Sequence, residues 1–334
     1  MSMTGHSILL IVGEITRGSL SAGTLELLGG GRKLAEALNG ILAIALLGHI
    51  PPAIAEEAIA HGADDVYVAE NPRLEAYQAG SYLQILERAI ADLRPEILLI
   101  GQTSMGRDLA PRLACRLRTG LSMDCVQLDI DPETGLMRMT RPVYGCKALA
   151  VTVCRTRPQM ATVRIGALRA GEPDMSRDGR IVPIASRIDE SLIAERLVER
   201  VEEQQEGIPL EEAQVVVCGG RGMGSADSFT LLDELAQLLG GTVGASRPPC
   251  DAGWMPSTRQ IGLTGKIVRP DLYVAVAVSG SSQHVAGCGG SGAIVAVNKD
   301  PEANIFSAAH YGVVGDYRDI LPPFIKRVRE IRGV

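Results

Sequence analysis

The sequence contains 334 residues, which is long enough for two domains of ordinary size. Hydrophobic residues make up 46% and charged residues 22%, as in a globular protein with a large buried core. The net charge of −6 at pH 7 argues against a nucleic-acid-binding surface. The apolar runs have only the length of strands, which excludes a membrane-spanning helix. One such run begins at residue 8 without a preceding signal segment, so we expect a cytoplasmic protein.

The seven cysteines are spread along the chain, and none of them forms a C-x-x-C pair. Their spacing therefore predicts neither a zinc ribbon nor an iron–sulfur cluster, and we expect no metal site. The simplest interpretation is that they are reduced, mostly buried thiols in a reducing compartment.

The first part of the chain alternates apolar runs with helical patterns. Continuous apolar runs at 8–12, 41–47, 65–69 and 96–101 are typical of strands that are covered on both faces of a sheet. The intervening stretches are amphipathic, and residues 81–93 carry leucine and isoleucine on one face of a helix. This alternation predicts a parallel α/β domain.

One helical pattern, over residues 25–38, is interrupted by Gly29, Gly30 and Gly31. Each glycine costs roughly 1 kcal/mol relative to alanine inside a helix. The sequence leaves two interpretations open, namely that the helix breaks here or that another part of the chain packs very close to it.

The pattern changes between residues 125 and 165, where short β-rich pieces are separated by glycine and proline turns. We expect these pieces to form an antiparallel addition to the first domain. For the charged, glutamate-rich stretch at 187–213 we expect a solvated helix or strand that leads into a linker, and we expect the linker near 190–212 to be mobile. A second parallel α/β unit begins near residue 214. The predicted domains are therefore residues 1–200 and residues 201–334.

The second unit has a glycine-rich turn, GGRGMG at 219–224, directly between a strand and a helix. Such a turn brings backbone N–H groups close to phosphate oxygens, but a plain tight turn explains the glycines equally well. Arg221 in the middle of the turn favours an anion-binding role.

Further polar loops follow the later strands of the second unit. They contain Ser246 with Arg247, Thr264, His284, Asn298 and Asp316. Ligands of parallel α/β sheets bind outside the carboxyl ends of the strands, so these loops together predict one binding site. No nucleophile is paired with a base, and the five histidines are scattered. The pattern indicates a protein that holds a cofactor, and we expect no catalytic residue.

These loops carry a resemblance to a known family. The stretches GGRG, GASRPPCDAGW, QIGLTGKIVRPDLYVAVAVSGSSQHVAG and VNKDPEANIF, in this order, closely resemble the FAD domain of electron transfer flavoprotein alpha subunits. In the first domain, GQTSMGRDLAPRLACRLRTGLSMDC and RPQMATVR are similar to the corresponding family stretches. The resemblance covers nearly the whole chain.

The resemblance implies a FAD site in the C-terminal domain. The resemblance implies that Thr264 lies near flavin N5 and that His284 lies near the N1/O2 edge. It also implies that Arg247 lies beside the isoalloxazine ring. A donor or cation at that edge would stabilise the negative charge of the reduced flavin. The implied cofactor-binding residues are Arg221, Ser246, Arg247, Ile261, Gly262, Leu263, Thr264, Ser279, Gly280, Ser281, Ser282, Gln283, His284, Asn298 and Asp316.

The resemblance also implies a heterodimer. Its beta subunit would contact the N-terminal domain of this chain and bind AMP or a second FAD. The pair would carry electrons from a flavin dehydrogenase, of the acyl-CoA dehydrogenase type, to a quinone oxidoreductase or similar acceptor, without transforming a substrate itself. Three alternatives stay open: a subunit of an electron-bifurcating flavoprotein that uses NADH, a stand-alone FAD-linked oxidoreductase, and a nucleotide sensor without redox activity.

The sequence departs from the family pattern at several positions. Leu263 stands where the family usually has glutamine, and His310 stands where aspartate is usual. The loop at 286–294 and the stretch YGCKALA at 144–150 also differ from the usual forms. We expect these changes to affect the flavin potential and the choice of partner, but not FAD binding.

Overall fold

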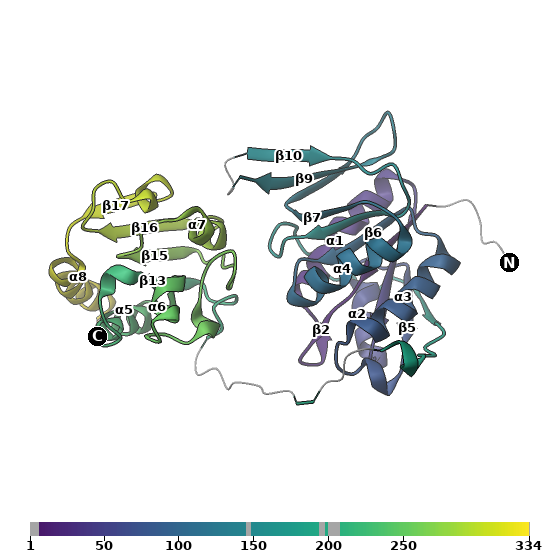
Figure 1. Ribbon diagram of the computed structural model, residues 1–334, viewed down its shortest axis with the longest axis horizontal. Helices are drawn as coiled ribbons and strands as arrows, with labels where there is room; N and C mark the ends of the chain where they lie inside the picture. The colour runs from purple at the N-terminus through teal and green to yellow at the C-terminus, as the bar shows by residue number, and fades with distance from the viewer. Residues whose placement is uncertain (1–6, 145–147, 194–197, 200–207, 334) are drawn as a thin grey trace. The chain divides into compact units, whose positions relative to one another are not determined.

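The computed structural model describes residues 7–144, 148–193, 198–199 and 208–333, and the chain divides into two compact units, Met1–Arg200 and Val201–Val334 (Figure 1). Residues 194–197 and 200–207 of the linker predicted near 190–212 lie outside the described residues. Within the described part of the chain, no helix has the length and apolar character needed to cross a bilayer.

The first unit is built on a seven-stranded sheet whose neighbouring strands all pair in parallel. The four strands predicted from apolar runs are all present in it. In spatial order the strands are β12 (Arg180–Pro183), β5 (Asp65–Ala69), β4 (Ile41–Leu47), β1 (Ile8–Val12), β6 (Ile97–Gly101), β11 (Gln159–Val163) and β7 (Leu121–Cys125).

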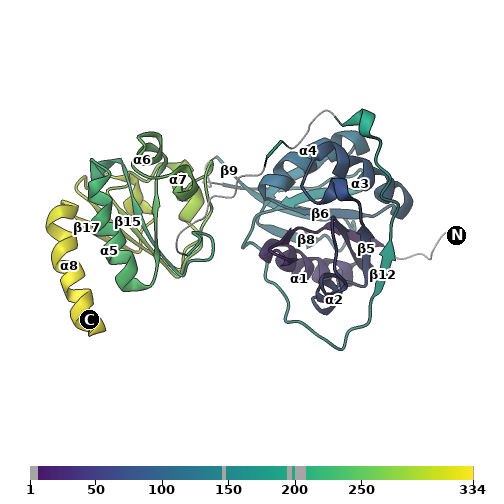
Figure 2. The same ribbon diagram turned by 90° about the horizontal axis from the view of Figure 1, so that it is seen from below.

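Helices cover both faces of this sheet, as Figure 2 shows. Alternate residues of β1 point to opposite faces. Leu9 and Ile11 share a core with one pair of helices, and Leu10 and Val12 share a second core with the other pair. The first pair is α1 (Ala22–Ala37) and α2 (Pro52–Ala60), and the second is α3 (Ala79–Leu93) and α4 (Ser104–Leu117). Burial on both faces explains why the strands are continuously apolar.

Helix α1 runs unbroken through Gly29, Gly30 and Gly31, so the interpretation of close packing is the correct one. A side chain at Gly29 would collide with the backbone oxygen of Arg169, and one at Gly30 would collide with the side chain of Leu168. At Gly31 a Cβ atom would lie only 3.0 Å from a methyl carbon of Leu42 in β4. The glycines therefore let the helix approach both the sheet and the segment that follows β11.

The antiparallel addition is confirmed in part. Strands β8 (Gln127–Ile130), β9 (Met137–Val143) and β10 (Ala148–Thr152) form a three-stranded antiparallel sheet with β9 in the centre. The expectation was wrong for residues 159–163, because β11 pairs in parallel with β6 and β7 inside the main sheet. This strand is completely buried, which a five-residue run with one glutamine and one threonine does not reveal.

The second unit contains a five-stranded parallel sheet. Its chain order reverses at β13, which has β14 on one side and β15 on the other. In spatial order the strands are β14 (Thr242–Ala245), β13 (Val215–Gly219), β15 (Leu272–Val276), β16 (Ala293–Asn298) and β17 (Tyr311–Val314).

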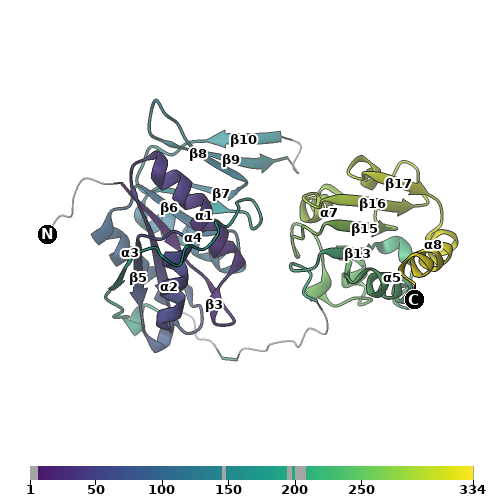
Figure 3. The ribbon, with the colours of Figure 1, turned by 180° about the vertical axis from the view of Figure 1, so that it is seen from behind.

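Two helices of the second unit, α5 (Thr230–Leu239) and α8 (Tyr317–Arg332), pack side by side on one face of the sheet, as Figure 3 shows. The shorter helices α6 (Arg247–Asp251) and α7 (Ser282–Cys288) begin directly after β14 and shortly after β15. The remaining short elements are β2 (Ile15–Thr16), β3 (Ser19–Leu20) and the 3₁₀ turns η1 (Pro72–Leu74), η2 (Glu190–Leu192), η3 (Arg221–Met223), η4 (Asp227–Phe229), η5 (Ser257–Arg259) and η6 (Asn304–Ser307).

Candidate functional site

An open cavity of about 740 Å³ lies at the carboxyl edge of the five-stranded sheet. It is found where the strand order reverses between β13 and β15, the usual place for a ligand in an open α/β sheet. All the residues predicted to form the cofactor site line this cavity, except Gly280, Ser282 and Asp316. Loops that are far apart in the sequence therefore meet at one place, as expected from the parallel order of the strands.

The three exceptions lie close to the cavity. Gly280 has φ +79°, and a side chain on it would collide with the backbone of Ile305. Ser282 is the first residue of α7, and its hydroxyl donates to Oε1 of Gln283 at 3.3 Å. Asp316 lines a small adjoining cavity of about 50 Å³, which shares Asn298 with the main one.

The glycine-rich turn after β13 packs directly against the end of β15. The backbone N–H of Gly222 donates to the carbonyl of Ala277 at 3.3 Å, and a side chain on Gly220 would collide with that carbonyl. Close packing therefore accounts for Gly220. Gly222 and Arg221 line the cavity, so the turn serves both the fold and the site.

Ala277 is a site residue that the sequence analysis missed. It has φ +54°, a left-handed conformation that is uncommon for alanine, and it contributes to both the main cavity and the small adjoining one. Strained backbone of this kind collects at functional sites. No local signal in the sequence marks this position, because the conformation follows from the turn packed against it.

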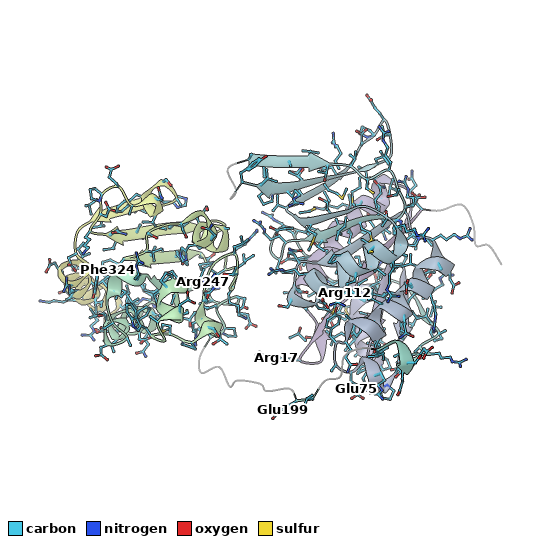
Figure 4. The ribbon with its side chains drawn as sticks, viewed as in Figure 1. Arg17, Glu75, Arg112, Glu199, Arg247 and Phe324 are labelled. Carbon is cyan, nitrogen blue, oxygen red and sulfur yellow. The ribbon has the colours of Figure 1, made fainter. Side chains whose placement is uncertain are left out.

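The loop after β14 places a cation at the cavity. Ser246 is buried and its backbone N–H donates to the carbonyl of Gly219 at 3.0 Å, which ties this loop to β13. Arg247 begins α6 (Figure 4), and its Nε atom lies 3.2 Å from a carboxylate oxygen of Asp251, one turn later in the same helix. Asp251, which the sequence analysis also missed, lines the cavity too. Both side chains are more than half exposed, so the pair leaves the guanidinium accessible.

The loop between residues 260 and 266 is fastened to α7. The N–H of Leu263 donates to the carbonyl of Gln283 at 2.8 Å, and the side-chain amide of Gln260 donates to the hydroxyl of Thr264 at 3.1 Å. Gly262 has φ +147°. Gly287 of α7 packs against it so closely that a side chain on Gly287 would collide with the backbone of Gly262. Leu263, the departure from the family pattern, is 47% exposed.

His284 is 4% exposed and lies in the wall of the cavity. Its Nδ1 atom is 3.2 Å from the carbonyl oxygen of Ile261, and its Nε2 atom is 3.0 Å from the hydroxyl of Tyr273. Burial lowers the pKa of His284 to about 4, although the Ile261 carbonyl acts in the opposite direction. The side chain is therefore neutral at physiological pH.

The part of the cavity around Asn298 has a polar lining. The amide of Asn298 donates to the carbonyl of Val278 at 2.8 Å, and its oxygen accepts from the N–H of Asp300 at 3.0 Å. Hydrogen bonds from the side chain and backbone of Arg318 lower the pKa of Asp316 to about 2, so this side chain is a carboxylate.

The cavity is also lined by Asp300, Glu302 and Asn304, which the sequence analysis did not select. They follow shortly after the predicted residue Asn298, and this position in the sequence could have identified them. By contrast, the departure at His310 lies outside the residues that line the cavity, and its Nδ1 atom accepts from the N–H of Ile294 at 3.0 Å.

Two family models match the chain. A model described as the electron transfer flavoprotein domain matches residues 9–187, and one described as the electron transfer flavoprotein FAD-binding domain matches residues 209–289.

Full-length relatives agree with these matches. The electron transfer flavoprotein subunit alpha of Thermoanaerobacterium thermosaccharolyticum is 43% identical over 99% of this chain and all of its own length. Protein FixB of Azotobacter vinelandii is 41% identical over 92% of this chain and 87% of its own. The acryloyl-CoA reductase electron transfer subunit beta of Anaerotignum propionicum is 37% identical over 95% of this chain and 94% of its own. The chain thus belongs to the electron transfer flavoprotein alpha-subunit family, and its second unit is a FAD-binding domain.

Proposed function

We propose that this chain carries FAD in the cavity of its second unit and, together with a beta subunit, moves electrons from a flavin dehydrogenase of the acyl-CoA type to a quinone oxidoreductase or a similar acceptor. When bound, FAD supplies the electron-transfer chemistry. The observation that carries this proposal is the cavity at the switch point of the sheet, lined by hydroxyls, backbone amides and two arginines.

The residues present fit FAD. The main cavity of about 740 Å³ shares Gly222, Ala277 and Asn298 with the small one, and the two linings together include both the loop at 260–264 and Asp316, which suits a ligand as large as a dinucleotide. Gly222 has no side chain to keep phosphates from the backbone of the turn, and Arg221 lies beside it. Arg247 lies on the same lining as Thr264, which supports its proposed place beside the flavin ring.

The state of His284 favours a carrier over an oxidoreductase that acts on its own substrate. A general acid or base needs a nitrogen within hydrogen-bond reach of the substrate, with a pKa near the working pH. Both ring nitrogens of His284 are occupied by protein partners, and its pKa is about 4. Among the described residues of the cavity wall it is the only histidine.

The N-terminal unit is proposed to contact the beta subunit, which would hold AMP or a second FAD. An exposed apolar row on the edge strand β10 supports this assignment. Leu149 and Val151 are 65% and 61% exposed, although they lie in regular secondary structure. Edge strands with exposed apolar side chains are usually covered by a partner.

A second candidate function is that of a subunit in an electron-bifurcating or CoA-ester-reducing complex. The observation that favours it is the similarity to a protein whose name describes an electron transfer subunit of an acryloyl-CoA reductase. Electron flow would then run toward a CoA ester, with NADH as the donor. The beta subunit, through the nucleotide that it binds, would decide between the two functions.

The test is to co-express the chain with its beta subunit and to measure bound flavin and the route of reduction. We expect one FAD on this chain, reduced rapidly by an acyl-CoA dehydrogenase with its substrate and not directly by a small organic donor. Direct reduction by NADH would favour the second candidate. Absence of flavin from this chain would contradict both.

A matched pair of variants sharpens this test. Arg247→Ala removes a cation from the cavity lining and is expected to lower the flavin potential, because the negative charge of reduced flavin loses a counter-charge. Arg327→Ala is the control, because Arg327 is likewise an exposed arginine paired with a carboxylate, Glu330, but it lies in α8. An equal potential in the two variants would contradict the proposed place of Arg247.

A further inference from the structure

The surroundings of His284 determine which of its nitrogens carries the proton. The carbonyl oxygen of Ile261 is only an acceptor, so Nδ1, at 3.2 Å, must be the donor in that hydrogen bond. In a neutral imidazole Nε2 is then the acceptor, and the hydroxyl of Tyr273, at 3.0 Å, is the donor. The two bonds hold the ring from opposite sides, one from the 260–266 loop and one from strand β15.

The other titratable groups around this ring are neutral near pH 7. Tyr273 is completely buried, which raises its pKa well above the ordinary value. Burial also raises the pKa of Cys218 in β13, and it raises that of Cys288 in α7 to about 11. These three residues therefore stay protonated between pH 6 and pH 8. Neither hydrogen-bond partner of the His284 ring is a carboxylate that would hold the ring as a cation.

The charged groups of the cavity lining all come from other elements. They are the cations Arg221 and Arg247 and the carboxylates Asp251, Asp300 and Glu302. Arg247 is paired with Asp251, which moderates its charge. His284 lies in the same cavity wall as these groups, but its side chain is only 4% exposed.

We propose that Tyr273 is a positioning residue, which together with the Ile261 carbonyl holds His284 as the neutral imidazole protonated on Nδ1, so that the positive charge in the lining of the main cavity comes from Arg221 and Arg247. The consequence for the cofactor rests on the proposed function. The hydrogen-bond arrangement itself is a property of the chain and can be tested without FAD.

The direct test is nuclear magnetic resonance of the full chain labelled with ¹⁵N in histidine, with His284→Gln to assign the signal. We expect Nδ1 of His284 to be protonated and Nε2 to be unprotonated from pH 8 to pH 6, with an Nδ1–H signal that persists in water. A signal from an Nε2–H tautomer, or from a doubly protonated ring at pH 7, would overturn the proposal. This measurement of the His284 nitrogens uses the unaltered chain, so it does not require that a Tyr273 variant folds.

Tyr273→Phe then tests the role of the hydroxyl. Loss of one of the two hydrogen bonds that hold the imidazole should increase the equilibrium constant for its release from this position by about a factor of ten. We expect the Nδ1–H proton of His284 to exchange with water at least about tenfold faster in this variant. Tyr82→Phe, which removes a buried hydroxyl from the other unit, is the control and should leave the signal unchanged. Equal exchange in Tyr273→Phe and the unaltered chain would overturn the role of Tyr273.

The consequence for the cofactor is tested on the FAD-loaded heterodimer. If His284 stays neutral in both redox states, the difference in flavin potential between the unaltered protein and His284→Gln is constant from pH 6 to pH 8. A difference that changes with pH, by up to about 59 mV per unit for one proton per electron, would overturn the assignment of the charge to the arginines. A chain that binds no FAD but shows the expected tautomer would instead contradict only the proposed function.

Discussion

At the scale of single residues, the buried imidazole of His284 links stability to pH. Its pKa is about 4 in the folded chain, compared with an ordinary value of 6.5. The unfolded state therefore binds a proton more readily than the folded state as the pH falls below 6.5. The stability that the neutral side chain contributes is complete above the unfolded pKa and is lost progressively between pH 6.5 and pH 4.

This linkage gives a prediction for His284→Gln. The unaltered chain should lose about 2 kcal/mol of unfolding free energy between pH 7 and pH 5 through this group, and the glutamine variant should lose correspondingly less. Urea denaturation of the FAD-free chain at the two pH values measures the difference. His310→Gln is the control, because His310 is exposed. If the unfolding free energy of both variants depends on pH as it does in the unaltered chain, His284 does not contribute to this dependence.

Most residues of the site could be predicted because they follow strands. Ser246 follows β14, Thr264 lies in the connection between β14 and β15, and Asn298 ends β16. The parallel order of these strands brings the three residues to one edge of the sheet. Ala277 and the sealed position of His284 could not be predicted in this way. Each depends on contacts between segments far apart in sequence, namely Gly220 against Ala277 and Tyr273 against His284.

At the scale of secondary-structure elements, helix α1 shows that helix propensity and packing oppose each other. Alanine is favoured over glycine in a helix by about 1 kcal/mol. At Gly29, however, the new methyl group would collide with the backbone of residues 169–171, which has little freedom to move away. Packing therefore prevails over propensity at this position.

Gly29→Ala should accordingly destabilise the chain, by about 1–3 kcal/mol, the usual cost of overpacking. Equilibrium unfolding in urea measures the change. Gly171→Ala provides the matched control, since Gly171 belongs to the segment that packs against the helix but has open space where its side chain would be. A stabilised Gly29→Ala variant would mean that the helix does not pack as described.

Strand β10 gives the second prediction at this scale. Replacing Leu149 and Val151 together by lysine should weaken binding of the beta subunit at least about tenfold, because charged side chains would replace apolar area that the partner covers. Titration calorimetry of the separated subunits measures the affinity. The same change at Val313 and Val314, which are 41% and 58% exposed on β17, should leave the affinity unchanged. Loss of binding in the β17 variant alone would place the interface on the other unit.

The elements themselves were well predicted where apolar runs are long, as for β1, β4 and β6. The mistaken antiparallel assignment of β11 has a physical cause. Its five residues follow two strands that do pair antiparallel, and the parallel pairings with β6 on one side and β7 on the other place it in the main sheet. Local sequence carries no information about that choice of partner.

At the scale of the whole molecule, each unit has its own pair of hydrophobic cores, one on each face of its sheet. The cavity with its arginines is formed entirely by the second unit. We therefore infer that the second unit alone holds the cofactor, and the proposed surface for assembly lies on the other unit.

Hydrogen exchange of the purified heterodimer with and without FAD shows which unit holds the cofactor. We expect one FAD per chain, slower exchange with FAD in the loops at 219–224, 244–254, 260–266 and 279–287, and no FAD-dependent change in residues 9–187. Ligand binding at 100 times its dissociation constant stabilises the unit that binds it by about 2.7 kcal/mol. Protection confined to the N-terminal unit, or a heterodimer whose flavin leaves these four loops unprotected, would contradict the assignment of the cofactor to the second unit.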